Sequence, residues 1–127
     1  MGLNTCWTAL TYKKVPEAFR LEPGEKLVIV IAAGYGNTQG VPHKSRPLEQ
    51  LSETPLPDAP AWYREGIEAA ALAPTAVNQQ KFRFKLEGKT VRMKAGLGPY
   101  AGIDLGIARY HFEIGACAEN FVFADSL

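Results

Sequence analysis

The sequence predicts a mixed α+β fold, and three patterns carry that prediction. A β-branched apolar run is typical of a strand, two alternating segments are typical of a hairpin, and two stretches show helical periodicity. The chain has 127 residues, with 46% hydrophobic and 21% charged residues, which is usual for one globular domain and excludes a disordered or fibrous chain. We expect the order strand, loop, helix, hairpin, helix.

The first third of the chain contains a predicted short helix and a predicted strand. Residues 15–21 favour a helix with Pro16 near its start, and Pro23-Gly24 favours a turn. Residues 26–33 are continuously apolar and β-branched, which predicts a strand buried on both faces. A loop rich in Gly, Asn and Pro is expected over residues 34–45.

The middle of the chain predicts a linker and then a helix. Residues 52–60 contain three prolines, which is typical of a linker or of a passage between packed units. Asp58 is the predicted N-cap of the next helix, and Pro74 is expected to end it. Its apolar side is expected to carry Trp62, Ile67, Ala70 and Ala71, and the alanine run 69–71 would let another backbone approach closely.

The last third predicts a hairpin and a long helix. Residues 81–86 and 90–94 alternate in polarity around Glu87-Gly88-Lys89, which indicates two strands and a tight turn. Asp104 is expected in the first turn of the helix, where a carboxylate complements the helix dipole. Apolar residues then recur at steps of three and four, which predicts a seam that packs on another helix: Ile103, Ile107, Tyr110, Ile114, Cys117 and Phe121.

Charge, hydropathy and cysteine content exclude several classes of protein. The net charge of +1 gives no global reason to bind nucleic acid or an acidic membrane. The chain has no apolar run of the about 20 residues that span a bilayer and no signal peptide at its start, so we expect a cytoplasmic protein. Cys6 and Cys117 are expected to be reduced and partly buried, without a metal site.

Two nucleotide-binding motifs are excluded by spacing. Residues 34–40 contain three glycines after a predicted strand, but the third comes one residue late and Val41-Pro42 follows in place of a helix start. The P-loop pattern is absent. No nucleophile and base stand at a convincing spacing, so no catalytic residue is predicted.

Two short segments carry candidate binding residues. Lys44 and Arg46 could hold a phosphate, and the alternative is an ordinary solvated basic loop. Thr75, Asn78 and Gln80 place a hydroxyl and two amides on a loop between a helix and a strand. These groups could hydrogen-bond to a flat heteroaromatic ring, and the alternative is helix capping and turn formation.

Four segments, in order, resemble the flavin-dependent nitroreductase family, and in particular a branch in which two such modules are fused. The first is Gly-Leu-Asn-Thr-Cys-Trp over residues 2–7, and the second combines residues 28–36 with Lys-Ser-Arg-Pro-Leu-Glu over 44–49. The third is Ala-Pro-Thr-Ala-Val-Asn-Gln-Gln over residues 73–80, which is similar to the family's flavin loop. The fourth is Ile-Asp-Leu-Gly-Ile-Ala over 103–108, which is similar to the start of its long dimer helix.

The resemblance implies a nitroreductase-like mixed sheet and a cofactor site. It implies FMN held between two modules, NAD(P)H as hydride donor, and a small-molecule acceptor of the nitro or quinone type. Lys44 and Arg46 match residues that meet the FMN phosphate, and Gly106 matches backbone near the reactive edge of the flavin. The loop beside the isoalloxazine would contribute Pro74, Thr75, Asn78 and Gln80.

The resemblance also implies an organisation into modules. Residues 1–54 would be the tail of a first module, and residues 55–127 an incomplete second module. The partner would be a second copy of the chain or a missing N-terminal module, bound through the helix over 103–121. The family's Arg-Arg-Ser-x-Arg motif is absent, Lys81 replaces a usual Pro, and Thr75 replaces a usual Ser. An alternative function is therefore a non-catalytic structural half that binds no flavin by itself.

Overall fold

The structure, a computed structural model, describes residues 2–9 and 16–124. The chain divides into two compact units, Met1–Pro42 and His43–Leu127. The second unit begins at His43, before the module boundary expected at residues 54 and 55. A compact unit is defined by contacts within the chain, whereas a module is defined by its evolutionary origin. The assignment of residues 1–54 and 55–127 to two modules therefore stays a prediction.

The first unit is built on a two-stranded antiparallel sheet. Strand β1 (Asn4–Thr8) pairs with β2 (Val30–Gly34), in a register that places Asn4 opposite Gly34. The side-chain oxygen of Asn4 accepts a hydrogen bond from the backbone N–H of Gly36 at 2.9 Å. A single 3₁₀ turn over Pro16–Ala18 replaces the short helix expected there, whose first residue lies outside the described part. The turn at Pro23-Gly24 is confirmed.

The prediction of a strand buried on both faces is wrong for this unit. β2 is shorter than residues 26–33, and all its residues except the half-buried Val30 are exposed. An apolar run in a sequence favours a buried strand, but it does not identify the residues that would cover the strand. In the described part of this unit β2 pairs only with β1, and none of the buried hydrophobic residues belongs to this unit, so no core covers the faces of β2. Cys6 on β1 is also exposed, as is Cys117 in the second unit, so the expected burial of both thiols is wrong.

The second unit contains the hairpin that the alternation predicts. Strand β3 (Phe82–Glu87) pairs with β4 (Thr90–Ala95), and Gly88 supplies the positive φ that the tight turn needs. The short strand β5 (Val122–Phe123) adds to β4 in parallel. On the other edge, residues 51–53 run along β3 and form two backbone hydrogen bonds with Phe84.

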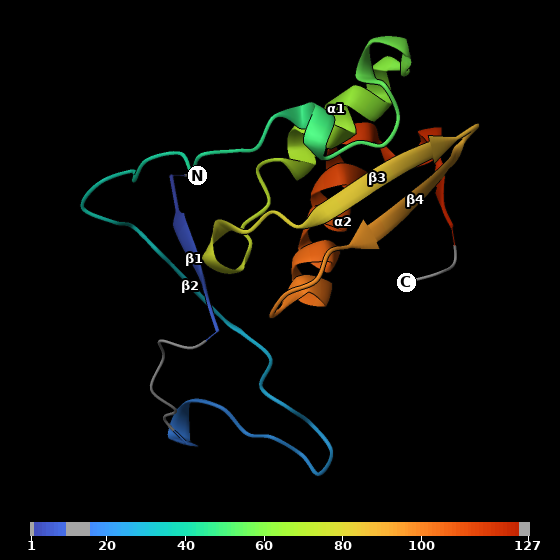
Figure 1. Cartoon of the computed structure of the whole chain (residues 1–127). Coiled ribbons are helices and arrows are strands. Elements are labelled where there is room, and N and C mark those ends of the chain that lie inside the picture. Colours follow the sequence, from blue (N-terminus) through green and yellow to red (C-terminus); the bar gives the residue numbers. More distant parts are fainter. Residues whose placement is uncertain (1, 10–15, 125–127) are drawn as a thin grey trace. The chain divides into compact units, whose positions relative to one another are not determined.

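Two helices lie on one face of this sheet (Figure 1). Helix α1 (Ala61–Ala70) and α2 (Ala101–Ala116) pack closely because glycines stand at their crossing. A Cβ at Gly115 would come within 2.6 Å of the Glu65 carbonyl oxygen and of the Ala69 Cβ. The close backbone approach expected at the alanine run is therefore confirmed at Ala69.

The core of the second unit is aromatic. Phe84 stacks on Phe112 with ring centroids 4.8 Å apart, and Tyr63 meets Phe112 edge-on at 5.6 Å. Burial raises the pKa of Tyr63, and its hydroxyl lies 3.0 Å from that of Ser52. Other buried residues complete this core: Leu51, Leu56, Ile67, Phe82, Val91, Leu105, Ala108 and Phe121.

Two expectations about residues 52–60 are wrong. The stretch is not a linker, because Leu56 and Ala59 are buried in the second unit and a 3₁₀ helix spans Leu56–Asp58. Asp58 lies in that turn and does not cap α1. Pro60 occupies the N-cap position, without a side-chain hydrogen bond. The helix ends at Ala70, so Pro74 lies beyond its end.

The long helix is confirmed, but the face that packs within the unit differs from the predicted seam. α2 ends at Ala116, because Cys117 has a φ of 57° and leaves the helix. The residues of α2 that join the core with α1 and the sheet are Leu105, Ala108, Phe112 and Ala116. Of the predicted seam, Tyr110 and Ile114 are exposed, whereas Ile103 and Ile107 are half-buried and Ile107 packs against the core. Cys117 and Phe121 lie beyond the end of α2, and Phe121 is buried in the core. The remaining 3₁₀ turns are Leu48–Gln50, Ala76–Asn78 and Ala118–Asn120.

Candidate functional site

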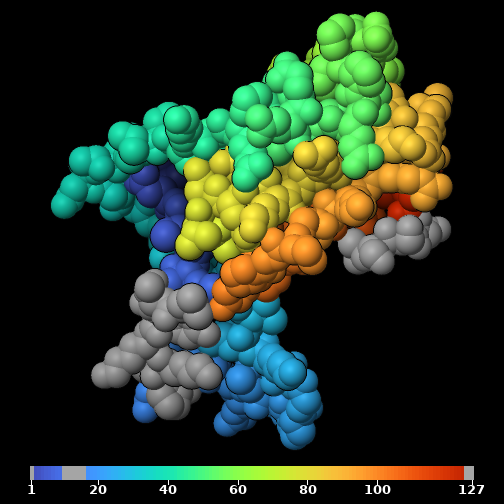
Figure 2. Space-filling model, viewed as in Figure 1, coloured from blue at the N-terminus to red at the C-terminus, as the bar shows by residue number. Residues whose placement is uncertain are grey.

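The two candidate binding segments lie side by side in the second unit. Residues 44–46 and 75–80 are about thirty residues apart in sequence, yet three side-chain hydrogen bonds join them. Figure 2 shows the green chain near residues 46–55 lying along the yellow chain near residues 75–85. The structure therefore brings together residues that the sequence could only place in separate loops.

Gln80 forms most of this junction. Its side-chain nitrogen donates to the Lys44 carbonyl oxygen at 2.9 Å and to Oδ1 of Asn78 at 2.7 Å. Its side-chain oxygen accepts from the backbone N–H of Arg46 at 2.8 Å. Only 3% of Gln80 is exposed, so these bonds satisfy an amide that would be costly to bury alone. The geometry makes Gln80 a residue that positions the two loops.

Asn78 and Thr75 complete the loop. Nδ2 of Asn78 donates to the Lys44 carbonyl oxygen at 3.1 Å, and the Thr75 hydroxyl oxygen accepts from the backbone N–H of Gln80 at 3.0 Å. Both Asn78 and Gln80 thus use their amides within the chain, as the turn-forming alternative expected. Asn78 is exposed, while Thr75 is half-buried and retains a hydroxyl hydrogen to donate.

The backbone of this loop is strained. Val77, Asn78 and Gln80 have φ values of 46°, 53° and 46°, in the left-handed region that residues with a Cβ avoid. A left-handed conformation at a β-branched residue such as Val77 is a particular outlier, and it costs about 1–2 kcal/mol. Such strain persists only where surrounding contacts hold it, and it is concentrated at binding sites.

Asp104 holds the other side of the loop. Its carboxylate oxygens accept from the backbone N–H of Ala76 at 3.0 Å and from Nε2 of Gln79 at 2.7 Å. The same Gln79 nitrogen donates to the Pro99 carbonyl oxygen at 2.7 Å. Asp104 is 2% exposed, so the start of α2 and the loop are fixed to each other through a buried carboxylate.

The remaining candidate residues surround this framework. Lys44 and Arg46 are exposed, and neither forms an ion pair with any described residue. Pro74 is half-buried at the start of the loop. Gly106 lies on the exposed side of α2, two residues after Asp104, and a Cβ there would meet no atom within 4 Å. This part of the described chain thus offers four features to a ligand: the cations of Lys44 and Arg46, the hydroxyl hydrogen of Thr75 and the open helix surface at Gly106.

A pocket of about 350 Å³ adjoins the junction. Arg46 and Gln80 line one part of it, and residues from both strands of the hairpin line the rest. Its lining is mainly polar and basic: Arg46, Gln50, Glu53, Gln80, Lys81, Phe82, Arg83, Lys94, Ala95 and Gly96.

Sequence reasoning missed the residues that hold the site together. Asp104 lies in the first turn of α2 as expected, but its second role, as an anchor of the loop, was missed, and Gln79 was not singled out. His43 and Ser45 were not singled out either, although both lie within hydrogen-bond distance of the Ala71 carbonyl oxygen, at 3.0 and 3.1 Å. A pairing of Asp104 with the loop has no local sequence signal, because the partners are 25 and 28 residues apart.

Two further properties bear on the class of site. Across residues 2–9 and 16–124, no three His, Cys, Asp or Glu side chains are grouped as a metal site requires. None of the helices described here is long and apolar enough to cross a membrane.

Comparisons with known proteins agree on one family. The model of a family described as "Putative TM nitroreductase" matches residues 1–116. A crystal structure of a "putative nitroreductase" from Thermotoga maritima MSB8 superposes with a TM-score of 0.68 at 28% sequence identity. The alignment covers 90% of this chain and 46% of that chain, so this chain spans under half the length of its relative. No curated protein matches.

Proposed function

This chain belongs to the nitroreductase family, and from that premise we propose that it is part of an FMN-dependent oxidoreductase. The reaction would pass a hydride from NAD(P)H through the flavin to a nitro or quinone-like acceptor. One observation carries the proposal: Gln80 and Asn78 join the basic segment 44–46 to the loop 75–80. These are the segments that the family resemblance assigns to the phosphate and to the ring of one cofactor.

The available groups fit FMN in part. Lys44 and Arg46 offer two exposed cations for a phosphate, and an Arg guanidinium matches a phosphate with two parallel hydrogen bonds. Pro74 and Thr75 would lie beside the isoalloxazine, with the Thr75 hydroxyl free to donate. Gly106 would let the flavin approach the backbone of α2, since no side chain stands there.

Gln80 and Asn78 have a different role in this proposal. Their amides are engaged with the chain, so they position Lys44 and Arg46 and leave contact with the ring to other groups. Bound FMN would supply the redox chemistry, and the residues of this chain would bind and orient it.

We also propose that the site is completed by a partner. The groups above serve the phosphate and one side of the ring, and the absent Arg-rich motif would leave the remainder to another surface. The outer face of α2, with the exposed Tyr110 and Ile114 and the half-buried Ile103 and Ile107, is the surface proposed to meet a second copy of the chain or a first module.

The alternative function is a structural half without flavin. The engagement of the Asn78 and Gln80 amides favours it, because a loop kept only for packing would show the same bonds. Absorbance spectroscopy separates the two functions. We expect the purified chain to retain a flavin spectrum after FMN is added and the excess removed by desalting. A colourless protein after that treatment would favour the structural half.

The phosphate assignment has its own test. Lys44→Ala combined with Arg46→Ala should weaken FMN binding by about 1–3 kcal/mol for each charge-assisted hydrogen bond that the substitutions remove. Fluorescence titration of FMN measures this directly. Arg20→Ala with Lys26→Ala removes the same two charges from exposed positions elsewhere and should leave the affinity unchanged. Equal affinities in both double variants would refute the assignment.

A further inference from the structure

The pocket beside the junction has a strongly positive lining. Four of its residues are cations, namely Arg46, Lys81, Arg83 and Lys94, and Glu53 is its one carboxylate, so the formal charge of the lining is +3. The whole chain carries only +1. The excess of positive charge is therefore concentrated at this place, and a concave basic site attracts anions more strongly than a flat one.

Two of these cations face each other across the hairpin. Arg83 on β3 and Lys94 on β4 are direct partners in the antiparallel register. Side chains at such positions leave the same face of the sheet with Cβ atoms about 5 Å apart, and like charges placed there destabilise the pair. In the part of the chain that the structure describes, neither Arg83 nor Lys94 forms an ion pair.

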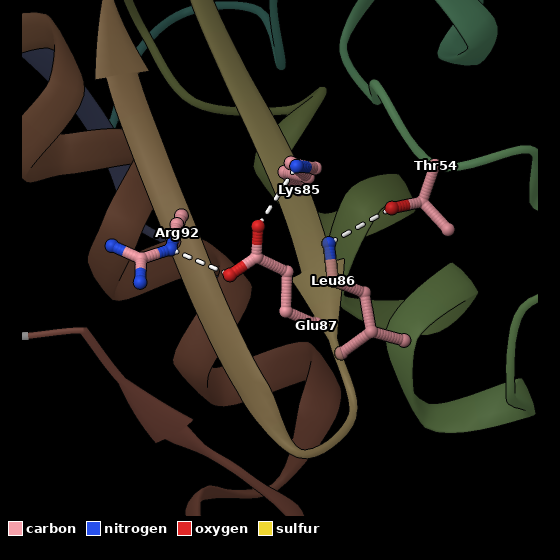
Figure 3. A network of polar contacts seen from close by, with 5 residues as sticks. All are labelled: Thr54, Lys85, Leu86, Glu87 and Arg92. Atoms are coloured by element: carbon pink, nitrogen blue, oxygen red, sulfur yellow. Dashed lines mark hydrogen bonds and ion pairs between the residues drawn. The ribbon is translucent and has the colours of Figure 1, made fainter.

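The next pair on the same face of the hairpin, two residues further along each strand, is neutralised, in contrast. Lys85 and Arg92 are also direct partners of like charge, but Glu87 bridges them (Figure 3). Its carboxylate lies 2.8 Å from Nζ of Lys85 and 2.7 Å from Nε of Arg92. These hydrogen bonds lower the pKa of Glu87 to about 2, so it stays ionised at neutral pH. The hairpin thus supplies an anion to one cationic pair and none to the other.

We propose that the pocket binds the phosphate group of a small molecule, with Arg83 and Lys94 as its principal ligands. Arg83 offers the planar fork that matches phosphate oxygens, and Lys94 offers a point charge on the opposite strand. Lys81 also lines the pocket, and its Nζ donates to the Leu97 carbonyl oxygen at 3.0 Å. A bound phosphate compensates the like charges of Arg83 and Lys94, as the Glu87 carboxylate compensates those of Lys85 and Arg92.

The size of the pocket indicates more than a free ion. A volume of about 350 Å³ lies at the lower end of small-molecule sites, which begin near 300 Å³. A phosphorylated small molecule or a diphosphate fits this volume. The proposal shares Arg46 with the proposed FMN site but does not require flavin, since Arg83 and Lys94 lie outside the segments assigned to FMN.

The test uses inorganic pyrophosphate as the probe, titrated calorimetrically into the chain at low ionic strength. We expect Arg83→Gln combined with Lys94→Gln to weaken pyrophosphate binding by about tenfold or more. Lys85→Gln combined with Arg92→Gln is the matched control, because it removes the same charges from the same two strands. The control should bind pyrophosphate as the unaltered chain does, and circular dichroism should show that both variants are folded.

The outcomes are decisive in each direction. No binding to the unaltered chain at millimolar pyrophosphate would overturn the proposal, and so would an equal loss in both double variants, which would indicate a general effect of charge. Succinate should bind more weakly than pyrophosphate, and equal binding would overturn the assignment to phosphate. If the unaltered chain binds pyrophosphate but not FMN, the proposed function is refuted and this proposal stands. If it binds FMN but not pyrophosphate, this proposal is refuted and the proposed function stands.

Discussion

At the scale of single residues, the site depends on amides and a carboxylate whose hydrogen bonds are made within the chain. Gln80 and Asp104 are almost fully buried, and each satisfies backbone groups on segments far from its own. Hydrogen bonds to such residues contribute little net stability while they are made, but removing one partner leaves buried groups unsatisfied. The effect of a substitution here is therefore larger than the net contribution of the bonds themselves.

Gln80→Ala should lower the free energy of unfolding by about 2–4 kcal/mol, because it leaves the Arg46 N–H and the Lys44 carbonyl without their partner. Urea denaturation followed by circular dichroism measures this loss. Gln50→Ala is the control, since Gln50 lines the same pocket but is exposed, and it should change stability by less than about 0.5 kcal/mol. Equal stabilities of the two variants would show that the junction does not hold the loops.

The residues of the junction could be singled out from the sequence, but their roles in it could not. Lys44, Arg46, Thr75 and Asn78 were singled out from their chemistry, and the structure places them around one junction. The buried engagement of Gln80 could not be predicted, because an amide on a polar loop has the same local signal whether it faces a ligand or a backbone. Burial is a property of the whole unit and is not encoded at one position.

At the scale of elements, local patterns predicted the second unit better than the first. The hairpin alternation and the turn glycine determine β3 and β4 locally, so both were correctly placed. The burial of β2 and the packing face of α2 were not predicted correctly, because each depends on which other elements pack against that strand or helix. α2 is apolar on two sides, and only the contact with α1 decides which side faces the core of its unit.

The crossing of α1 and α2 gives a prediction at this scale. Gly115→Ala should destabilise the chain by about 1–3 kcal/mol, because the new Cβ would lie 2.6 Å from the Glu65 carbonyl oxygen. Gly102→Ala on the same helix meets no atom within 4 Å and should raise stability by up to about 1 kcal/mol through better helix propensity. Thermal unfolding of both variants measures the difference. A Gly115→Ala variant as stable as Gly102→Ala would contradict the close crossing.

At the scale of the whole molecule, the family and fold class were predicted from four ordered segments, each of them weak alone. Their order is informative because a chance match would not reproduce it, and the family model spans the same region. The oligomeric state cannot be predicted from the order of these segments or from their residue patterns. It depends on a face of α2 that the second unit leaves open, where Tyr110 and Ile114 are 64% and 63% exposed.

That open face gives the prediction at the largest scale. Ile114→Asp should shift the chain toward monomers if two copies meet through α2, because association would then bury an unpaired carboxylate. The substitution should leave the fold intact, since Ile114 is exposed in the single chain. Leu72→Asp is the matched control, because Leu72 is 65% exposed and lies outside α2. Sedimentation velocity over a range of concentrations should show a lower average mass for Ile114→Asp only. If the unaltered chain self-associates and Ile114→Asp leaves its average mass unchanged, the interface lies elsewhere. If the unaltered chain is monomeric, this face binds a different polypeptide, and a first nitroreductase module is the next partner to test.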